Sequence, residues 1–147
     1  MRRSCLVGET VLNASASDDL MGAGGAPIVL VVEDDVLARY ALCDAFRYDG
    51  LRVLEASSVA EAKAILLSSV AVDLVFIDLN IPGEGDGLTV AEFAKEQRPA
   101  AKVVFTSGRA PARLRPQLES FGPFVPKPFI ISRVIRLIRQ TLARQPE

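Results

Sequence analysis

Carboxylates follow two of the most apolar segments of the sequence. Glu33 and Asp34 come directly after the run 28–32, and Asp78 follows the segment 73–77. Carboxylates about 4 Å apart repel by roughly 4 kcal/mol per pair at an effective dielectric constant near 20, so a cluster of three needs a cation. Oxygen ligands without histidine or thiolate suit Mg²⁺, which keeps several waters when it binds. If the fold brings these acids together, the sequence predicts a divalent-cation site with one carboxylate free to meet a phosphoryl group.

Two further polar side chains follow later strand-like segments. Thr106 ends the segment 102–106, and Lys127 follows the short segment 124–125 and precedes Pro128. An ammonium group in such a cluster offsets negative charge and holds a phosphoryl oxygen as a point charge. Each residue alone has a simpler explanation, because acids after strands usually cap helices and Lys-Pro usually forms a surface turn. Their joint placement after four of five strand-like segments is not explained by capping.

These segments belong to a regular alternation of strand and helix patterns. The predicted strands are 28–32, 51–55, 73–77, 102–106 and 124–125, and the predicted helices are 36–48, 59–68, 88–97 and 130–144. The alternation predicts an α/β fold with a five-stranded parallel sheet and helices on both faces. Parallel strands point their carboxyl ends to one edge, where ligands bind at the switch point in strand order. The polar groups described above are therefore expected to converge there.

Local signals refine the predicted helices. In 36–48, near-helical spacing is shared by the apolar residues Leu37, Tyr40, Ala41, Cys43 and Phe46. Ser58 and Glu61, three residues apart, form a capping-box pattern at the start of the next helix. Pro111 and Pro116 interrupt the region where a fourth helix is expected. Because a proline inside a helix costs about 3 kcal/mol, we predict that this helix is short, irregular or broken.

Composition excludes several classes of protein. The chain has 147 residues, of which 50% are hydrophobic and 24% charged, and this fits one globular domain. It has no histidine, which excludes Ser-His-Asp and Cys-His catalysis and histidine-ligated metals. Its two cysteines, Cys5 and Cys43, do not form a disulfide framework, which favours a reducing, cytoplasmic compartment. We expect neither export nor a membrane span, because no apolar run approaches the roughly 20 residues that a span needs.

The first 26 residues differ from the rest of the chain. They contain Gly22, Gly24 and Gly25 and no clear period, so we predict a flexible extension over 1–26 and a single domain over 27–147. An alternative interpretation is that the protein starts at Met21 and that residues 1–20 are a misassigned extension.

Charge is divided unevenly along the sequence. Residues 1–100 hold 8 Lys and Arg against 16 Asp and Glu, whereas residues 101–147 hold 9 against 2. One interpretation is that these charges lie on solvated surfaces and are divided between the two parts of the sequence by chance. The other is that the first part forms an acidic site and the second a basic contact face. The same alternatives apply to Arg133, Arg136 and Arg139, which are either solvated or a docking face for an acidic partner or a second copy in a homodimer. Nucleic acid is the least favoured partner, because the net charge is −1.

Taken together, the motifs resemble the receiver domain of two-component response regulators. The resemblance covers residues 28–143 and rests on Glu33-Asp34-Asp35, Asp78-Leu79-Asn80-Ile81-Pro82, Gly85-Asp86-Gly87, Thr106-Ser107-Gly108 and Lys127-Pro128-Phe129. It implies a doubly wound (βα)5 flavodoxin-like fold with strand order 2-1-3-4-5. The loop after Asp78 carries one more residue between Pro82 and Asp86 than the commonest family pattern, and Gly83 and Gly85 can absorb it.

The resemblance also implies roles for individual residues. Asp78 matches the phosphoacceptor, Asp34 the acid that binds Mg²⁺ directly, and Glu33 its partner, often through water. Asn80 matches the residue whose backbone carbonyl binds Mg²⁺.

Further matches concern charge neutralisation and switching. Lys127 matches the family's lysine, and Pro128 after it typically follows a cis peptide bond. Thr106 matches the switch hydroxyl, and Phe124 the aromatic switch position. Asn80 and Gly108 occupy positions at which family members tune the lifetime of the acyl phosphate.

The implied function is a phosphoryl-accepting switch rather than an enzyme with an external substrate. A histidine kinase or histidine phosphotransferase would supply the phosphoryl group, and an unknown downstream protein would bind the product. A stand-alone receiver is the first interpretation, and a receiver fragment of a hybrid kinase or a phosphorylation-independent pseudo-receiver are alternatives. An aspartyl-phosphate hydrolase of the haloacid dehalogenase type is disfavoured, because Asn80 stands where such enzymes need a second acid.

Overall fold

A single parallel sheet forms the centre of the molecule, seen in a computed structural model that describes residues 25–145. Its strands are β1 (Ile28–Val32), β2 (Arg52–Ala56), β3 (Leu74–Asp78), β4 (Lys102–Ser107) and β5 (Phe124–Pro126). They pair in the order β2-β1-β3-β4-β5, and every pair is parallel. The predicted fold class and strand order are confirmed. The extension predicted over 1–26 lies, except for its last two residues, outside the described part of the chain.

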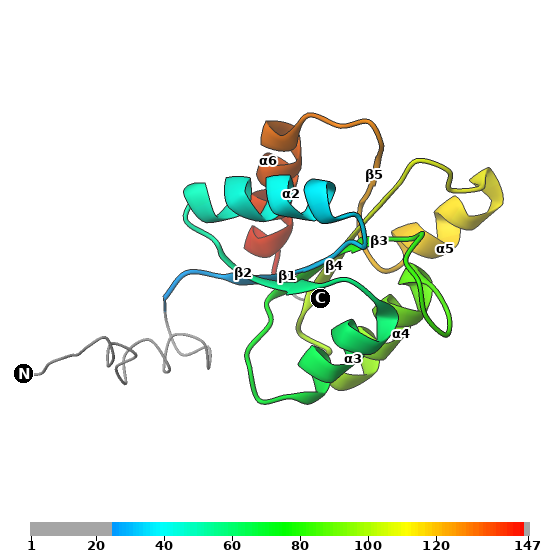
Figure 1. Cartoon of the computed structure of the whole chain (residues 1–147), viewed down its shortest axis with the longest axis horizontal. Coiled ribbons are helices and arrows are strands. Elements are labelled where there is room, and N and C mark those ends of the chain that lie inside the picture. Colours follow the sequence, from blue (N-terminus) through cyan, green and yellow to red (C-terminus); the bar gives the residue numbers. More distant parts are fainter. Residues whose placement is uncertain (1–24, 146–147) are drawn as a thin grey trace, which may run out of the picture.

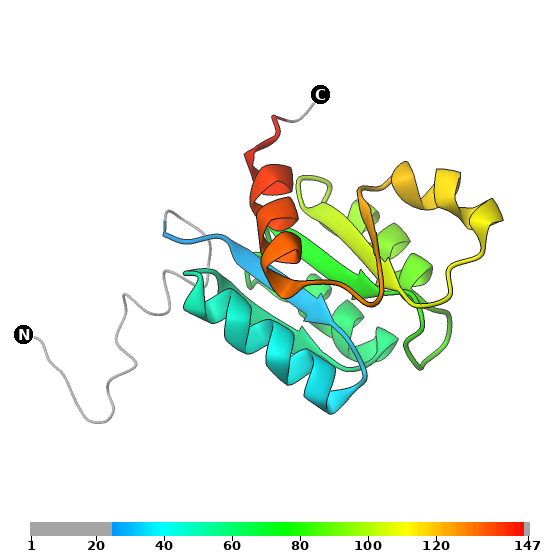
Figure 2. The ribbon, with the colours of Figure 1, turned by 90° about the horizontal axis from the view of Figure 1, so that it is seen from above.

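Helices cover both faces of this sheet (Figures 1 and 2). On one face lie α2 (Val36–Tyr48) and α6 (Ile131–Ala143), and on the other lie α3 (Val59–Leu67), α4 (Gly87–Gln97) and α5 (Arg115–Glu119). Each face encloses its own apolar core. The strands β1 and β3 are buried along their whole length because they lie in the middle of the sheet, which explains their unbroken apolar sequences. None of the helices in the described residues is long and apolar enough to span a membrane.

The buried face of α2 differs from the predicted one. Leu37 is 80% exposed and Tyr40 is 69% exposed, whereas Leu42, Cys43 and Phe46 are buried. With 3.6 residues per turn, Leu37 lies on the opposite side of the helix from Phe46, so the predicted apolar set combined two opposite faces. Only the face with Phe46 meets the sheet.

The fourth helical region is short and irregular, as predicted. A 3₁₀ turn, η2 (Ala112–Leu114), leads into the five-residue α5. Pro116 stands in the first turn of α5, where a backbone N–H has no helical partner. The helix begins late enough to place Pro116 in its first turn, so the cost of an interior proline is avoided.

The loop between β3 and α4 contains two glycines in the left-handed region. Gly83 has φ of 132° and Gly85 has φ of 105°. Asp86 ends the loop and caps α4 by accepting hydrogen bonds from the N–H groups of Leu88 and Thr89. This carboxylate is therefore a structural cap and lies outside the acidic cluster.

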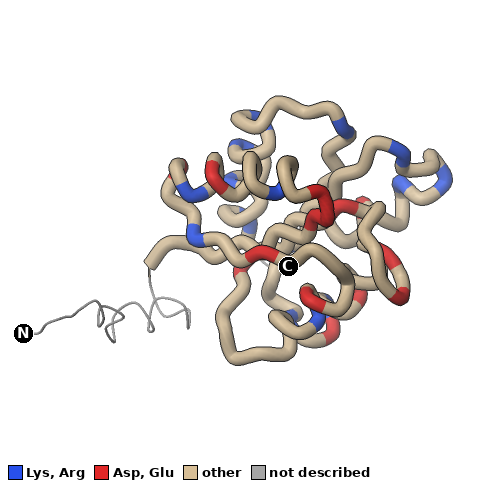
Figure 3. Tube along the Cα trace, in the orientation of Figure 1, with Lys and Arg blue, Asp and Glu red and all other residues tan. Residues whose placement is uncertain are grey.

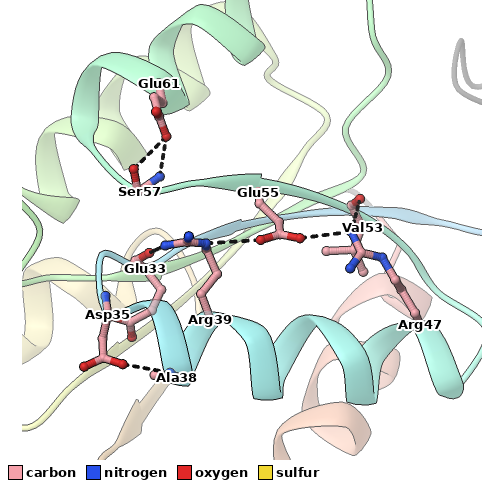
Figure 4. A network of polar contacts seen from close by, with 9 residues as sticks. All are labelled: Glu33, Asp35, Ala38, Arg39, Arg47, Val53, Glu55, Ser57 and Glu61. Atoms are coloured by element: carbon pink, nitrogen blue, oxygen red, sulfur yellow. Dashed lines mark hydrogen bonds and ion pairs between the residues drawn. The ribbon is translucent and has the colours of Figure 1, made fainter.

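The cap of α3 is formed slightly differently from its prediction. Ser58 Oγ accepts the Glu61 N–H at 3.2 Å, as expected for the N-cap. The Glu61 carboxylate, however, accepts from the backbone N–H and the hydroxyl of Ser57, one residue earlier than a capping box requires. These two hydrogen bonds, drawn in Figure 4, lower the pKa of Glu61.

The basic stripe predicted on the last helix is partly used inside the fold. Arg139 donates to the Asp49 carboxylate at 3.0 Å and to its backbone carbonyl at 2.6 Å, which ties α6 to the end of α2. Arg133 and Arg136 are exposed.

Gly87, the first residue of α4, packs closely against the end of β3. A Cβ added to it would stand 2.6 Å from the Asp78 carbonyl oxygen and 2.7 Å from Leu79 Cα. We expect Gly87→Ala to lower the free energy of unfolding by about 1–3 kcal/mol, although alanine is the better helix former. Urea unfolding measures this difference. Gly108→Ala is the control, because its Cβ would meet only Lys127 Cβ at 3.9 Å, and equal stability of the two variants would contradict the prediction.

Candidate functional site

Three carboxylates meet where β1 and β3 end, as the sequence predicts. Glu33, Asp34 and Asp78 each offer an oxygen, and these atoms lie within 4.8 Å of one another. The residues come together because β1 and β3 are neighbours in the sheet and both end at the same edge. Figure 3 shows acidic segments of the tube close together in the same orientation as Figure 1. Glu33 is 1% exposed and Asp78 is 5% exposed, whereas Asp34 is exposed to solvent. The cluster is thus buried on one side and open on the other.

Lys127 bridges the two buried carboxylates. Its ammonium nitrogen donates to Asp78 Oδ2 at 2.8 Å and to Glu33 Oε2 at 3.0 Å. The lysine is held by its own backbone N–H, which donates to the Ser107 carbonyl at 3.0 Å. The peptide bond between Lys127 and Pro128 is cis, as the family resemblance implies.

The electrostatics of the cluster favour a bound cation. Burial raises the pKa of Glu33 and the charge of Asp78 raises it further, against the opposing hydrogen bond from Lys127. Burial disfavours the ammonium form of Lys127, but hydrogen bonds and charge from Asp78 and Glu33 outweigh it and raise the pKa. Lys127 is therefore a cation at neutral pH, but its single positive charge is outnumbered by the three carboxylates of the cluster. Their oxygen donors fit a hard divalent ion such as Mg²⁺.

Thr106 lies next to Asp78 in the sheet. The two residues are partners in the register of β3 and β4. Thr106 is fully buried, and its hydroxyl has no hydrogen-bond partner in the structure. A buried hydroxyl without a partner costs about 1–3 kcal/mol, so this group is available to a ligand that arrives beside Asp78.

An open hollow of about 410 Å³ leads to the Asp78 carboxylate. It is lined by Asp78, Asn80, Gly108, Arg109 and Lys127. The backbone N–H of Asn80 donates to Asp78 Oδ1 at 2.9 Å. Sequence reasoning did not identify Arg109 as a lining residue, and its position three residues after Thr106 was the only available signal.

The side chain of Asn80 is held by a residue that the sequence analysis did not single out. Ser107 Oγ donates to Asn80 Oδ1 at 2.7 Å and accepts from the Arg109 N–H at 3.0 Å. Ser107 therefore links the loop after β3 to the loop after β4.

Phe124 lies on β5 and is half-buried. The Arg115 guanidinium stands 4.5 Å above the centre of its ring, which is cation–π geometry. Phe124 pairs with Phe105, one position before Thr106, in the register of β4 and β5. The predicted switch residues thus lie on adjacent strands.

A comparison with protein families decides the family of this chain. Residues 29–139 match the model of the response regulator receiver domain. The chain belongs to this family. The receiver domain is 34% identical over 125 residues to the sensor kinase CckA of Brucella abortus (strain 2308), which covers 82% of the chain and 13% of the kinase. It is 39% identical over 83 residues to the aerobic respiration control protein ArcA of Escherichia coli (strain K12), covering 56% of the chain and 34% of ArcA. The chain thus spans well under two thirds of either relative.

Solved structures agree with the family. The response regulator receiver protein of Sinorhizobium medicae WSM419 superposes with a TM-score of 0.76 at 28% identity, covering 82% of this chain and 98% of that one. The receiver domain of the hybrid histidine kinase CckA has a TM-score of 0.67 at 31% identity, covering 78% and 98%. The receiver domain is therefore similar both to a response regulator receiver protein and to the receiver domain of a hybrid histidine kinase.

Proposed function

We propose that this receiver domain accepts a phosphoryl group on Asp78 and works as a phosphorylation-dependent signalling switch. The proposal rests on the surroundings of the Asp78 carboxylate. This group lines an open hollow, and Lys127 and two further acids lie around it. An oxygen of Asp78 attacks the phosphorus atom of a phosphohistidine. The P–N bond breaks, and the imidazole leaves with the electron pair and takes up a proton.

Other residues of the chain are proposed to bind the phosphoryl group and the metal. Lys127 is placed to bind an oxygen of the incoming phosphoryl group and to offset its charge. Glu33, Asp34 and Asp78, with the backbone carbonyl of Asn80, would hold Mg²⁺, which neutralises phosphoryl oxygens when bound. Hydrolysis reverses the modification, since attack of water on phosphorus restores the carboxylate and releases inorganic phosphate.

The signal is read out by Thr106 and Phe124. The partnerless Thr106 hydroxyl is available to donate to a phosphoryl oxygen on Asp78. The modification adds about −1.5 to −2 charges if it resembles other protein phosphates. Movement of Thr106 and a change of the Phe124 ring would shift the population between two states of the protein.

The partners follow from this chemistry. Because the sequence has no histidine, the donor phosphohistidine lies outside it, on a histidine kinase or a histidine phosphotransferase. Such a phosphorelay places the receiver domain in the cytoplasm, with residues 1–26 as an extension of the domain over 27–147. Its catalysis is limited to its own phosphorylation and dephosphorylation.

Small phosphodonors test the proposal directly. Incubation with phosphoramidate or acetyl phosphate and Mg²⁺ is expected to add the mass of one phosphoryl group to the intact protein. The gain should disappear when EDTA removes the metal. No gain under conditions that preserve acyl phosphates would overturn the proposal and favour a phosphorylation-independent scaffold.

A further inference from the structure

Arg39 reaches from α2 back to the loop that carries two of the acids (Figure 4). Its Nη1 atom donates to the backbone carbonyl of Glu33 at 2.8 Å. Its Nε atom donates to the Glu55 carboxylate on β2 at 3.1 Å. The Arg39 side chain is 18% exposed, and its contact with the Glu33 carbonyl is partly buried, whereas its contact with Glu55 is exposed.

The carbonyl that Arg39 binds belongs to the peptide unit between Glu33 and Asp34. The backbone N–H of Glu33 still pairs with the Ala56 carbonyl of β2 at 3.0 Å, but the register between β1 and β3 ends at Val32. The Glu33 carbonyl is therefore satisfied by a side chain rather than by the sheet. Because a peptide unit is planar and contains the Cα atoms of both residues, holding this carbonyl restrains the positions from which both acidic side chains leave the backbone.

Glu55 aims the Arg39 guanidinium. One of its carboxylate oxygens accepts from Arg39, and the other accepts from Arg47 Nη2 at 3.2 Å. Arg47 also donates to the Val53 carbonyl at 3.3 Å and is drawn on the far side of Glu55 from Glu33 in Figure 4. Arg39 and Arg47 thus share one anionic partner, and of the two only Arg39 bonds the acidic loop.

We propose that Arg39 is a positioning residue for the metal site. Aimed by Glu55, it holds the peptide unit between Glu33 and Asp34 so that both carboxylates face the cation. The inference rests on the proposed function, since it concerns the Mg²⁺ site assigned there. Outer-shell partners of this kind typically contribute 10- to 100-fold to metal affinity.

The direction in which the Mg²⁺ affinity changes when Arg39 is removed distinguishes a positioning role from a purely electrostatic one. A guanidinium near a cation site repels the cation, so its charge alone would weaken binding. Removing it would then tighten Mg²⁺ binding. Removing a positioning contact has the opposite result, because the two carboxylates lose their common orientation.

Mg²⁺ affinity, measured by isothermal titration calorimetry on the unphosphorylated protein, tests this inference. We expect Arg39→Gln to weaken binding about tenfold, and Arg47→Gln, which removes the same charge from the same network, to stay within about twofold of the wild type. An affinity of Arg39→Gln equal to or tighter than that of the wild type overturns the inference, and so does an equal loss in both variants.

Two additional variants complete the experiment. Arg39→Lys keeps the positive charge, but an ammonium group lacks the planar fork with which the guanidinium donates to both the Glu33 carbonyl and the Glu55 carboxylate. The Mg²⁺ affinity of this variant should therefore lie between those of the wild type and Arg39→Gln. Asp34→Asn removes a proposed ligand and should abolish binding, which tests the metal site separately. Wild-type protein that binds no Mg²⁺ would contradict the proposed metal site, whereas normal wild-type binding with an unaffected Arg39→Gln contradicts only the role of Arg39. Circular dichroism confirms that each variant is folded.

Discussion

Asp78→Asn is expected to abolish the mass gain with phosphoramidate and Mg²⁺ completely. The amide has no anionic oxygen to attack phosphorus, and the other two acids of the cluster, at the end of β1, are proposed ligands of the metal. The substitution also removes a negative charge beside the buried Glu33, so we expect the folded state to survive it. Intact-protein mass spectrometry measures the modification, and thermal unfolding shows that the variant is folded.

Asp44→Asn is the matched control for this experiment. Asp44 is an exposed acid of α2, and its side chain makes no hydrogen bond or ion pair with the residues that the structure describes. It should accept one phosphoryl group as the wild type does. A full mass gain in Asp78→Asn would show that another side chain is the acceptor, and mapping the modified peptide would identify it.

Much of this site could be predicted because parallel sheets place strand ends together. The apolar runs before Glu33 and Asp78 could be recognised as buried strands, and their neighbouring positions in the sheet bring the acids within 4.8 Å. Lys127 follows the same logic, since β5 ends at the same edge. Prediction succeeded where one strong local pattern and one topological rule were enough.

The structure differs from expectation where tertiary contacts choose between local alternatives. The apolar residues of α2 occupy two faces, and only packing against the sheet decides that Phe46 is buried and Leu37 is not. The network around Arg39 joins residues 16 positions apart through side chains, and no spacing rule connects them. The bond from Ser107 to Asn80 likewise depends on how two loops meet at the sheet edge.

Lys127→Gln is expected to slow phosphorylation by small donors about 100-fold or more. Removing one preorganised donor from a site of developing charge typically costs this much. The loss should not come from weaker metal binding, because removing a positive charge from the cluster favours a divalent cation. The rate of mass gain at saturating Mg²⁺, together with calorimetric Mg²⁺ affinity, separates the two effects.

The same substitution should destabilise the metal-free protein. It leaves Glu33 and Asp78 buried without the ammonium group that pairs with them. Because the Lys127 side chain is 31% exposed, we expect the free energy of unfolding to fall by about 1–3 kcal/mol rather than by the full cost of breaking a buried pair. Because the pKa of Lys127 is raised, the stability that its ammonium group contributes is present in the neutral range and is lost as pH rises through that pKa. Arg136→Gln, which removes an equal charge from the exposed surface of α6, is the control for both measurements. Wild-type phosphorylation rates in Lys127→Gln would mean that the ammonium group neutralises the resting cluster without taking part in phosphoryl transfer.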